Sequence, residues 1–113
     1  IGERMDDPVL KRYNGYDDCY VLRPGLDYAA RAYSPDSGIG LEVATDQPGM
    51  QFYSGNHIEG LQGKDGAVYH DHDAFALEPE GYPCAPNIPS FPSAVLRPGK
   101  EYRRFISYRF SVR

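Results

Sequence analysis

Three side chains that can bind hydroxyl groups or move protons lie on short segments with the character of β-strands. Glu78 stands in an apolar run that begins at Phe75 and leads into a loop with four prolines, at 83, 86, 89 and 92. Gln51 follows the turn sequence Gln47-Pro-Gly49, and Asp17 precedes the apolar run from Cys19 to Leu22. Carboxylates accept protons, and an amide both donates and accepts hydrogen bonds. A carboxylate on a short apolar strand before a proline-stiffened loop, as at Glu78, is typical of a fixed general base that is presented to a ligand.

Each of the three residues also has a simpler interpretation. Glu78 lies between Leu77 and Pro79, so we expect its carboxylate to be partly desolvated, which favours the proton-accepting chemistry of a base near neutral pH. A glutamate at a strand end more often points into water, and composition alone favours that outcome. Gln51 could instead cap a neighbouring strand, and Asp17 could be a turn-forming loop residue.

Three histidines are candidates for metal binding. His70 and His72 are two residues apart, a spacing that places two imidazoles on one face of a strand. Asp71 and Asp73 are interleaved with them and no third ligand motif is nearby, so a solvated loop is the favoured interpretation. His57 has no assigned role. We expect no metal and no cofactor.

The composition predicts an all-β protein and excludes several classes of function. Among 113 residues there are 12 glycines, 10 prolines, 10 tyrosines and 5 phenylalanines, a mixture that favours short strands and frequent turns. The net charge is -4 with interspersed signs, so we expect no nucleic-acid partner. No apolar run approaches the ~20 residues that cross a bilayer, so we expect no membrane partner. Two cysteines, Cys19 and Cys84, are expected to be free thiols, although a single bridge between them stays open.

Alternation and turn residues predict the order of elements. Residues 1–14 read as an entering loop, and strands are expected at 19–23, 28–33, 39–45, 50–54, 75–80 and 102–113. The first two strands are expected to form a hairpin or meander. Pro48 and Gly49 predict a turn in which Gly49 takes a positive φ. The four prolines predict an ordered or extended loop without ladder pairing over 81–92.

Several of these motifs together resemble one protein family. The segments Thr45-Asp-Gln-Pro-Gly-Met-Gln-Phe-Tyr-Ser-Gly-Asn56 and Phe75-Ala-Leu-Glu-Pro-Glu80, with the runs 14–22 and 95–102, resemble the C-terminal active-site strands of the aldose 1-epimerases, the galactose mutarotase family. The resemblance implies a large antiparallel β-sandwich. It further implies that residues 1–113 are the C-terminal portion of one such domain, with its N-terminal portion absent from the chain.

The resemblance also assigns roles. In the family the glutamate that corresponds to Glu78 is the base that removes the proton of the anomeric hydroxyl, and the residues that correspond to Asp17 and Gln51 hold sugar hydroxyls. The family's general acid is a histidine of the N-terminal part, and none of the three histidines of this chain stands in a matching context. Asp18 stands where many relatives have histidine.

Glu80 departs from the family pattern, in which glutamine is commoner at this position. Residues i and i+2 of a strand share a face about 6.6 Å apart, so two carboxylates there would perturb each other's ionisation. Alternatively, the chain twists at Pro79 and Glu80 faces solvent. The second arrangement is slightly favoured.

The resulting hypothesis is an aldose 1-epimerase that interconverts the α and β anomers of an aldohexose. Its expected partners are a monosaccharide, galactose or glucose, and either the missing N-terminal portion or a second copy of the chain. The expected location is the cytoplasm, although Ile1 is not a natural start residue. The alternative is a non-catalytic sugar-binding or regulatory protein of the same fold, and a third hypothesis is a purely structural β-domain.

Overall fold

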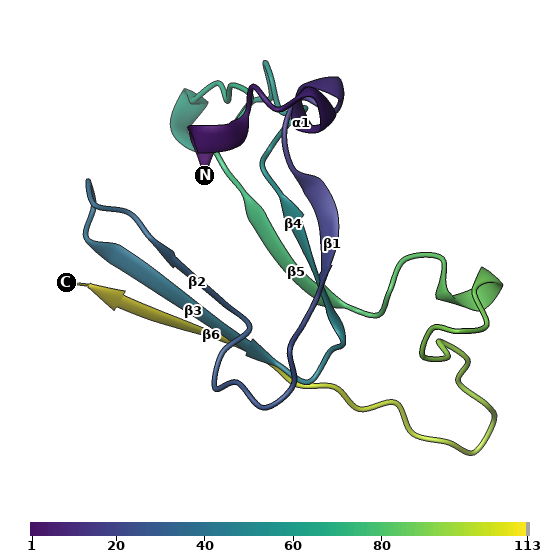
Figure 1. Ribbon diagram of the computed structural model, residues 1–113. Coiled ribbons are helices and arrows are strands. Elements are labelled where there is room, and N and C mark those ends of the chain that lie inside the picture. The colour runs from purple at the N-terminus through teal and green to yellow at the C-terminus, as the bar shows by residue number, and fades with distance from the viewer. Residues whose placement is uncertain (113) are drawn as a thin grey trace. The chain divides into compact units, whose positions relative to one another are not determined.

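The structure is a computed structural model that describes residues 1–112, and it consists mainly of strands in two three-stranded sheets (Figure 1). One sheet has the order β1-β4-β5 and the other the order β2-β3-β6. The strands are β1 Asp17–Val21, β2 Ala30–Tyr33, β3 Ile39–Thr45, β4 Gly49–Tyr53, β5 Ala76–Glu80 and β6 Ile106–Val112. The all-β class predicted from composition is therefore confirmed. None of the described helices is long and apolar enough to span a bilayer.

The chain divides into two compact units. Unit 1 contains Ile1–Asp18 and Gln51–Glu78, and unit 2 contains Cys19–Met50 and the chain from Pro79 onward. The unit boundaries fall within strands β1, β4 and β5. All three residues singled out from the sequence, Asp17, Gln51 and Glu78, lie in unit 1.

The sheet of unit 2 is antiparallel and has an apolar and a polar face. β3 pairs with β2 on one side and with β6 on the other, with Val43 opposite both Ala30 and Tyr108. Val43 is fully buried. On the opposite face the Glu42 carboxylate forms ion pairs with Arg31 of β2 and Arg109 of β6, at 2.8 and 3.8 Å. Cross-strand pairs of opposite charge and the strict alternation of β3 and β6 fix this register.

The predicted hairpin or meander of the first two strands is wrong. β1 belongs to the sheet with β4 and β5, whereas β2 forms its hairpin with β3. The turn residues of Ser34–Gly38 close that hairpin, with the Gly38 amide donating to the Ser34 carbonyl at 2.9 Å. The segment between β1 and β2 contains Pro24-Gly25, which is a turn signal that does not specify which strand pairs with which.

The entering loop contains a short helix that the sequence analysis missed. Residues Pro8–Arg12 form α1, and a 3-10 turn at Gly2–Arg4 precedes it. Asp7 is the N-cap of α1, and its carboxylate accepts from the Val9 amide at 2.9 Å. Proline at the first helical position and an Asp cap are start signals. The helix has only five residues, too few for the hydrophobic period to be recognised.

Gly49 is required for a reason other than the one predicted. It is the first residue of β4, and it is not among the glycines of positive φ. A Cβ at this position would lie 2.9 Å from Cys19 Sγ and 3.1 Å from the Tyr82 ring. Glycine is therefore needed for close approach of other side chains, not for a left-handed turn.

The predicted loop after β5 is confirmed, whereas the last strand is shorter than expected. Residues 81–105 contain only a 3-10 turn at Ala85–Asn87, and β6 begins at Ile106 instead of 102. Within this loop the rings of Tyr82 and Phe91 pack edge to face at 5.0 Å. Residue 113, the predicted end of this strand, lies outside the described residues.

A buried polar network in unit 1 joins the start of β1 to the end of β4. Ser54 and Asn56 are 3% and 1% exposed. The Asn56 amide donates to the carbonyls of Tyr13 and Tyr16, both at 3.1 Å, and its oxygen accepts from Ser54 Oγ at 2.6 Å. Ser54 Oγ also accepts from the Tyr16 amide at 2.9 Å. Because each buried polar group has a partner, the network fixes where β1 starts relative to β4 within unit 1.

Gly15 lies directly on this network. Its φ is +136°, and a Cβ would collide with Asn56 Oδ1 and Ser54 Oγ. We predict that Gly15→Ala destabilises the protein by about 3 kcal/mol or more, since it combines backbone strain with overpacking. Gly60→Ala is the matched control, because Gly60 has φ +76° with nothing within 4 Å of the added Cβ, and should cost only about 1–2 kcal/mol. Urea unfolding measures both variants, and equal losses would contradict the role given to the network.

Candidate active site

Asp17 and Gln51 are brought together on neighbouring strands. Gln51 lies on β4, the central strand of its sheet, and its Nε2 donates to Asp17 Oδ1 of β1 at 2.7 Å. The Asp17 side chain is exposed and Gln51 is half-buried. An amide that donates to one carboxylate oxygen leaves the other oxygen available for a hydroxyl donor. The two residues therefore form one hydrogen-bonded unit and not two separate contacts.

The Gln51 amide has a buried acceptor without a partner. Gln51 Oε1 is the buried side-chain oxygen or nitrogen that lacks a hydrogen bond among the described residues. Reversing the amide would place Oε1 against the Asp17 carboxylate, which accepts only. The observed orientation is therefore set by Asp17, and the unpaired oxygen could accept a hydrogen bond from an added donor.

Glu78 lies on β5, the strand next to β4, and is exposed. The partial desolvation predicted from its apolar neighbours is wrong for this chain. The flanking residues Leu77 and Pro79 are half-buried, but side chains alternate along a strand, so their burial does not extend to Glu78. The carboxylate is accessible to a ligand.

Glu80 does not point freely into water, which was the slightly favoured prediction. It is half-buried at the end of β5. Burial, together with the charge and hydrogen bond of Glu80, raises the pKa of Cys19. Cys19 and Cys84 are both free thiols, as predicted. The sequence contained no signal that would pair residues 19 and 80.

The loop between β4 and β5 is tied to the start of β1 through Asp71. The Asp71 carboxylate accepts from the amides of Ile58 and Glu59, at 2.9 and 3.0 Å, and from Asn14 Nδ2 at 2.8 Å. Partial desolvation acts to raise the pKa of Asp71, but these hydrogen bonds and the neighbouring His72 outweigh it and lower the pKa. The sequence did not predict this interaction, although Asn14 and Asp71 are residue types that commonly cap loops.

The histidines are loop residues, as predicted, and the described residues contain no cluster of three or more side chains suited to a metal ion. His70 Nδ1 lies 2.8 Å from Glu59 Oε1. His72 Nδ1 donates to the Ser54 carbonyl at 2.9 Å, which links it to the buried network. His57 is exposed, and its backbone amide donates to the Tyr53 hydroxyl at 3.0 Å.

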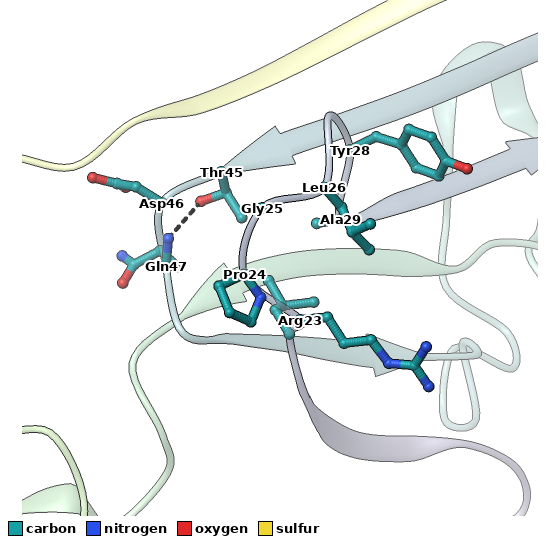
Figure 2. Close-up of a pocket in the computed structure, with 10 residues that line it drawn as sticks. Arg23, Pro24, Gly25, Leu26, Tyr28, Ala29, Thr45, Asp46 and Gln47 are labelled. Carbon is teal, nitrogen blue, oxygen red and sulfur yellow. Dashed lines mark hydrogen bonds between the residues drawn. The ribbon is translucent and has the colours of Figure 1, made fainter.

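A cavity of about 220 Å³ in unit 2 is lined by other residues, those of the segment Leu22–Ala29 and of the turn at Thr45–Gln47. Figure 2 shows the Thr45–Gln47 hydrogen bond at its edge and the side chains of Arg23 and Asp46 pointing in opposite directions. Asp46 Oδ1 accepts from the Phe105 amide at 2.8 Å. The charges do not converge on the cavity, so it is not a second candidate site.

Comparison with known proteins shows to which family the chain belongs. The sequence profile of the aldose 1-epimerases matches residues 1–109, nearly the whole chain. The chain belongs to the aldose 1-epimerase family. The resemblance inferred from the motifs is thereby confirmed.

The relatives agree in sequence and in fold. The chain is 46% identical over 115 residues to the galactose mutarotase of Homo sapiens, covering 99% of this chain and 33% of that protein. It is 36% identical over 113 residues to the aldose 1-epimerase of Escherichia coli (strain K12), covering 96% and 33%. A crystal structure of a GalM/aldose epimerase homologue from C. elegans superposes with a TM-score of 0.80 at 34% identity, covering 86% of this chain and 30% of that one. The chain thus spans about a third of the length of these relatives, and its strands have the antiparallel arrangement of the mutarotase fold.

The Asp17–Gln51 hydrogen bond can be tested without a ligand. We predict a coupling of about 0.5–1.5 kcal/mol in a double-mutant cycle of Asp17→Ala and Gln51→Ala, measured by urea unfolding. Asp17→Asn should cost less than Asp17→Ala, because an amide at 17 can donate to Gln51 Oε1 once the Gln51 amide reverses. Additive single losses would show that the pair does not interact in solution.

The His70–Glu59 pair predicts a pH dependence. The hydrogen bond and charge of Glu59 raise the pKa of His70, and the hydrogen bond from His70 lowers the pKa of Glu59. A raised histidine pKa stabilises the fold below the ordinary value of about 6.5, and this contribution is lost as the pH rises through the folded pKa. A lowered glutamate pKa stabilises the fold above a pH of about 4.3, and this contribution is lost as the pH falls through the folded pKa. The pair therefore stabilises the fold in the pH range between the folded pKa of Glu59 and the folded pKa of His70.

Replacing Glu59 should remove this effect. We predict that Glu59→Gln lowers the pKa of His70, as followed by the imidazole proton shifts in an NMR titration. Glu101→Gln, at an exposed glutamate of unit 2, should leave the titration of His70 unchanged. An unchanged His70 titration in the Glu59 variant would contradict the pairing.

Proposed function

We propose that this chain carries the base and part of the sugar site of an aldose 1-epimerase, an isomerase that interconverts the α and β anomers of an aldohexose. The observation that carries the proposal is the hydrogen bond between Asp17 and Gln51 in a member of this family. It joins Asp17 of β1 to Gln51 of β4, and β4 lies next to β5, the strand that carries Glu78. The substrate is a monosaccharide, galactose or glucose, in keeping with relatives named galactose mutarotase and aldose 1-epimerase.

Glu78 acts as the general base. Its carboxylate removes the proton of the O1 hydroxyl, the O–H electrons form the C1=O1 carbonyl, and the bond from C1 to the ring oxygen breaks with its electron pair going to the ring oxygen. A proton delivered to the ring oxygen completes ring opening. Rotation about C1–C2 and the reverse steps on the other face give the second anomer. The exposure of Glu78 allows a hydroxyl to approach it within hydrogen-bond distance.

The proton for the ring oxygen comes from outside this chain. His57, His70 and His72 all belong to the loop between β4 and β5, and two of them are engaged with Glu59 and with the Ser54 carbonyl. We assign the acid to the remainder of a longer protein, of which residues 1–113 are the C-terminal portion of a single domain. The exposed apolar side chains of β6 support this, since Phe110 and Val112 are 68% and 81% exposed. Such a surface normally packs against another part of the fold.

Asp17 holds a sugar hydroxyl and Gln51 orients Asp17. The Gln51 amide donates a hydrogen bond to Asp17 Oδ1. This bond orients the Asp17 carboxylate and leaves its second oxygen to accept from a sugar hydroxyl. That second hydrogen bond is made to a hydroxyl that does not react, so it contributes to binding in the ground state and the transition state alike.

Removing the base should lower the mutarotation rate and leave the sugar affinity nearly unchanged. In the full-length protein we predict that Glu78→Gln lowers the mutarotation rate at saturating sugar by about 10²–10⁴-fold, because an amide keeps the shape but cannot accept a proton. Sugar affinity should stay within a few-fold. Polarimetry of freshly dissolved α-galactose or α-glucose measures the rate, and calorimetric titration measures the affinity.

Asp17→Asn is the matched control, since it also replaces a carboxylate by an amide in unit 1. It should weaken binding and leave the rate at saturating sugar largely unchanged. A Glu78 variant with the parent's rate would refute the base assignment. A parent protein that binds the sugar without accelerating mutarotation would favour the non-catalytic sugar-binding alternative.

A further inference from the structure

The dipeptide Asn14-Gly15 lies between α1 and β1 in unit 1. Asparagine followed by glycine is the sequence in which asparagine loses its side-chain nitrogen most readily. The backbone nitrogen of the glycine attacks the side-chain carbonyl carbon, and the missing Cβ leaves this approach unhindered. The other two asparagines of the chain, Asn56 and Asn87, are not followed by glycine. Asn14 is therefore the position at which deamidation is expected.

The fold itself requires both residues of this dipeptide. Asn14 has φ +58°, a left-handed conformation that asparagine adopts more readily than most residues. Its Nδ2 donates to the Asn56 carbonyl at 2.7 Å and to Asp71 Oδ2 at 2.8 Å. Gly15 is buried at φ +136° and has no room for a Cβ. The reactive dipeptide is thus a consequence of how the chain turns from α1 into β1.

The same hydrogen bonds oppose the reaction in the folded protein. The Gly15 amide, which would have to attack, donates to the Leu10 carbonyl at 2.9 Å. The Asn14 side-chain nitrogen, which would have to leave, is held by its two acceptors. Cyclisation moves these two groups toward each other and breaks their hydrogen bonds, which costs free energy. Burial of Gly15 also keeps away the base that must remove its amide proton.

The reaction balances with water as the co-reactant. The Gly15 nitrogen forms a bond to Asn14 Cγ and loses its proton, while the bond from Cγ to Nδ2 breaks and the side-chain nitrogen leaves as ammonia. Water then opens the resulting succinimide ring at either carbonyl, which gives aspartate or isoaspartate at position 14. Nothing is oxidised or reduced. The net change replaces a side-chain amide by a carboxylate and adds a negative charge.

A carboxylate at position 14 cannot make the contacts of the amide. Its oxygens only accept hydrogen bonds, and the two present partners, the Asn56 carbonyl and Asp71 Oδ2, are acceptors as well. Two carboxylates would face each other where a hydrogen bond now joins the β4–β5 loop to the start of β1. Asp71 Oδ1 also accepts from the amides of Ile58 and Glu59. Displacing Asp71 would therefore loosen the loop at both amides.

We propose that Asn14 is a deamidation site that the fold protects, and that its modification releases the β4–β5 loop from the start of β1. The reaction proceeds through local opening of the α1–β1 junction, and its product opposes reclosure. The release is permanent, because the ammonia is lost to solvent. The proposal concerns the stability of unit 1 and does not depend on the proposed function.

Peptide mass spectrometry of the full-length protein tests the protection. During incubation at pH 8, the tryptic peptide that begins at Tyr13 should deamidate at least about tenfold more slowly in buffer than in concentrated urea, because the reaction requires the open state. Asp71→Ala should raise the rate in buffer several-fold and leave the rate in urea unchanged. Asp73→Ala is the matched control, since the Asp73 carboxylate accepts from the His70 amide, and it should leave both rates unchanged.

Two outcomes of this experiment would overturn the proposal. Equal rates in buffer and in urea for the parent protein would show that the fold does not protect Asn14. An unmodified Asn14 in urea would show that the dipeptide is not a deamidation site. Both comparisons use the parent protein, so they hold even if a variant fails to fold.

A variant that carries the product's charge tests the consequence. Asn14→Asp in the full-length protein should speed hydrogen exchange at the amides of Ile58 and Glu59 by about tenfold, as followed by NMR. Adding Asp71→Asn restores a donor and an acceptor at this contact and should return most of the protection. Asn87→Asp, at an exposed asparagine of unit 2, adds the same charge and should change neither amide. Exchange at the parent's rate in Asn14→Asp, or no recovery with the reversed pair, would refute the release of the loop.

Discussion

The buried hydrogen bonds of Asn56 and Ser54 are the constraint on which unit 1 depends. They satisfy the carbonyls of Tyr13 and Tyr16 and the Tyr16 amide, immediately before β1 begins at Asp17. An unpaired buried polar group costs about 1–3 kcal/mol, so the network has one satisfied arrangement and resists partial opening. It leaves no room for a side chain at Gly15. The chain must therefore enter β1 at one fixed point beside the end of β4.

The candidate site follows from that fixed entry. With β1 held against the end of β4, Asp17 Oδ1 lies 2.7 Å from Gln51 Nε2. Each of the two side chains therefore limits which hydrogen bonds the other can still form. Glu78 on the next strand is exposed, so this chain does not enclose the carboxylate that we propose as the base. Enclosure would strengthen the electrostatics of a proton transfer by excluding water. In the proposed full-length enzyme that enclosure, like the acid, comes from the part that this chain does not contain.

The sequence predicted local features well and long-range features poorly. The strand Ile39–Thr45 was predicted with its observed bounds because a period of two is a local signal. The pairing of β1 with β4 instead of β2 was missed, since turn residues do not specify a partner strand. The role of Gly49 was missed for the same reason, because its contact with Cys19 joins residues 30 positions apart. Asp17, Gln51 and Glu78 were singled out through their motifs, but only the structure shows the hydrogen bond between the first two.

The central claim is that the Glu78 carboxylate accepts the anomeric proton, and chemical rescue tests it most directly. In the full-length protein, Glu78→Ala leaves space beside the sugar that a small carboxylate such as formate can enter. The account predicts that formate restores mutarotation by this variant in proportion to its concentration and leaves the parent unaffected, as a diffusible base replaces the missing one. A variant whose rate does not respond to formate, while it still binds the sugar with the parent's affinity and retains much of the parent's rate, would contradict the assignment of Glu78 as the base.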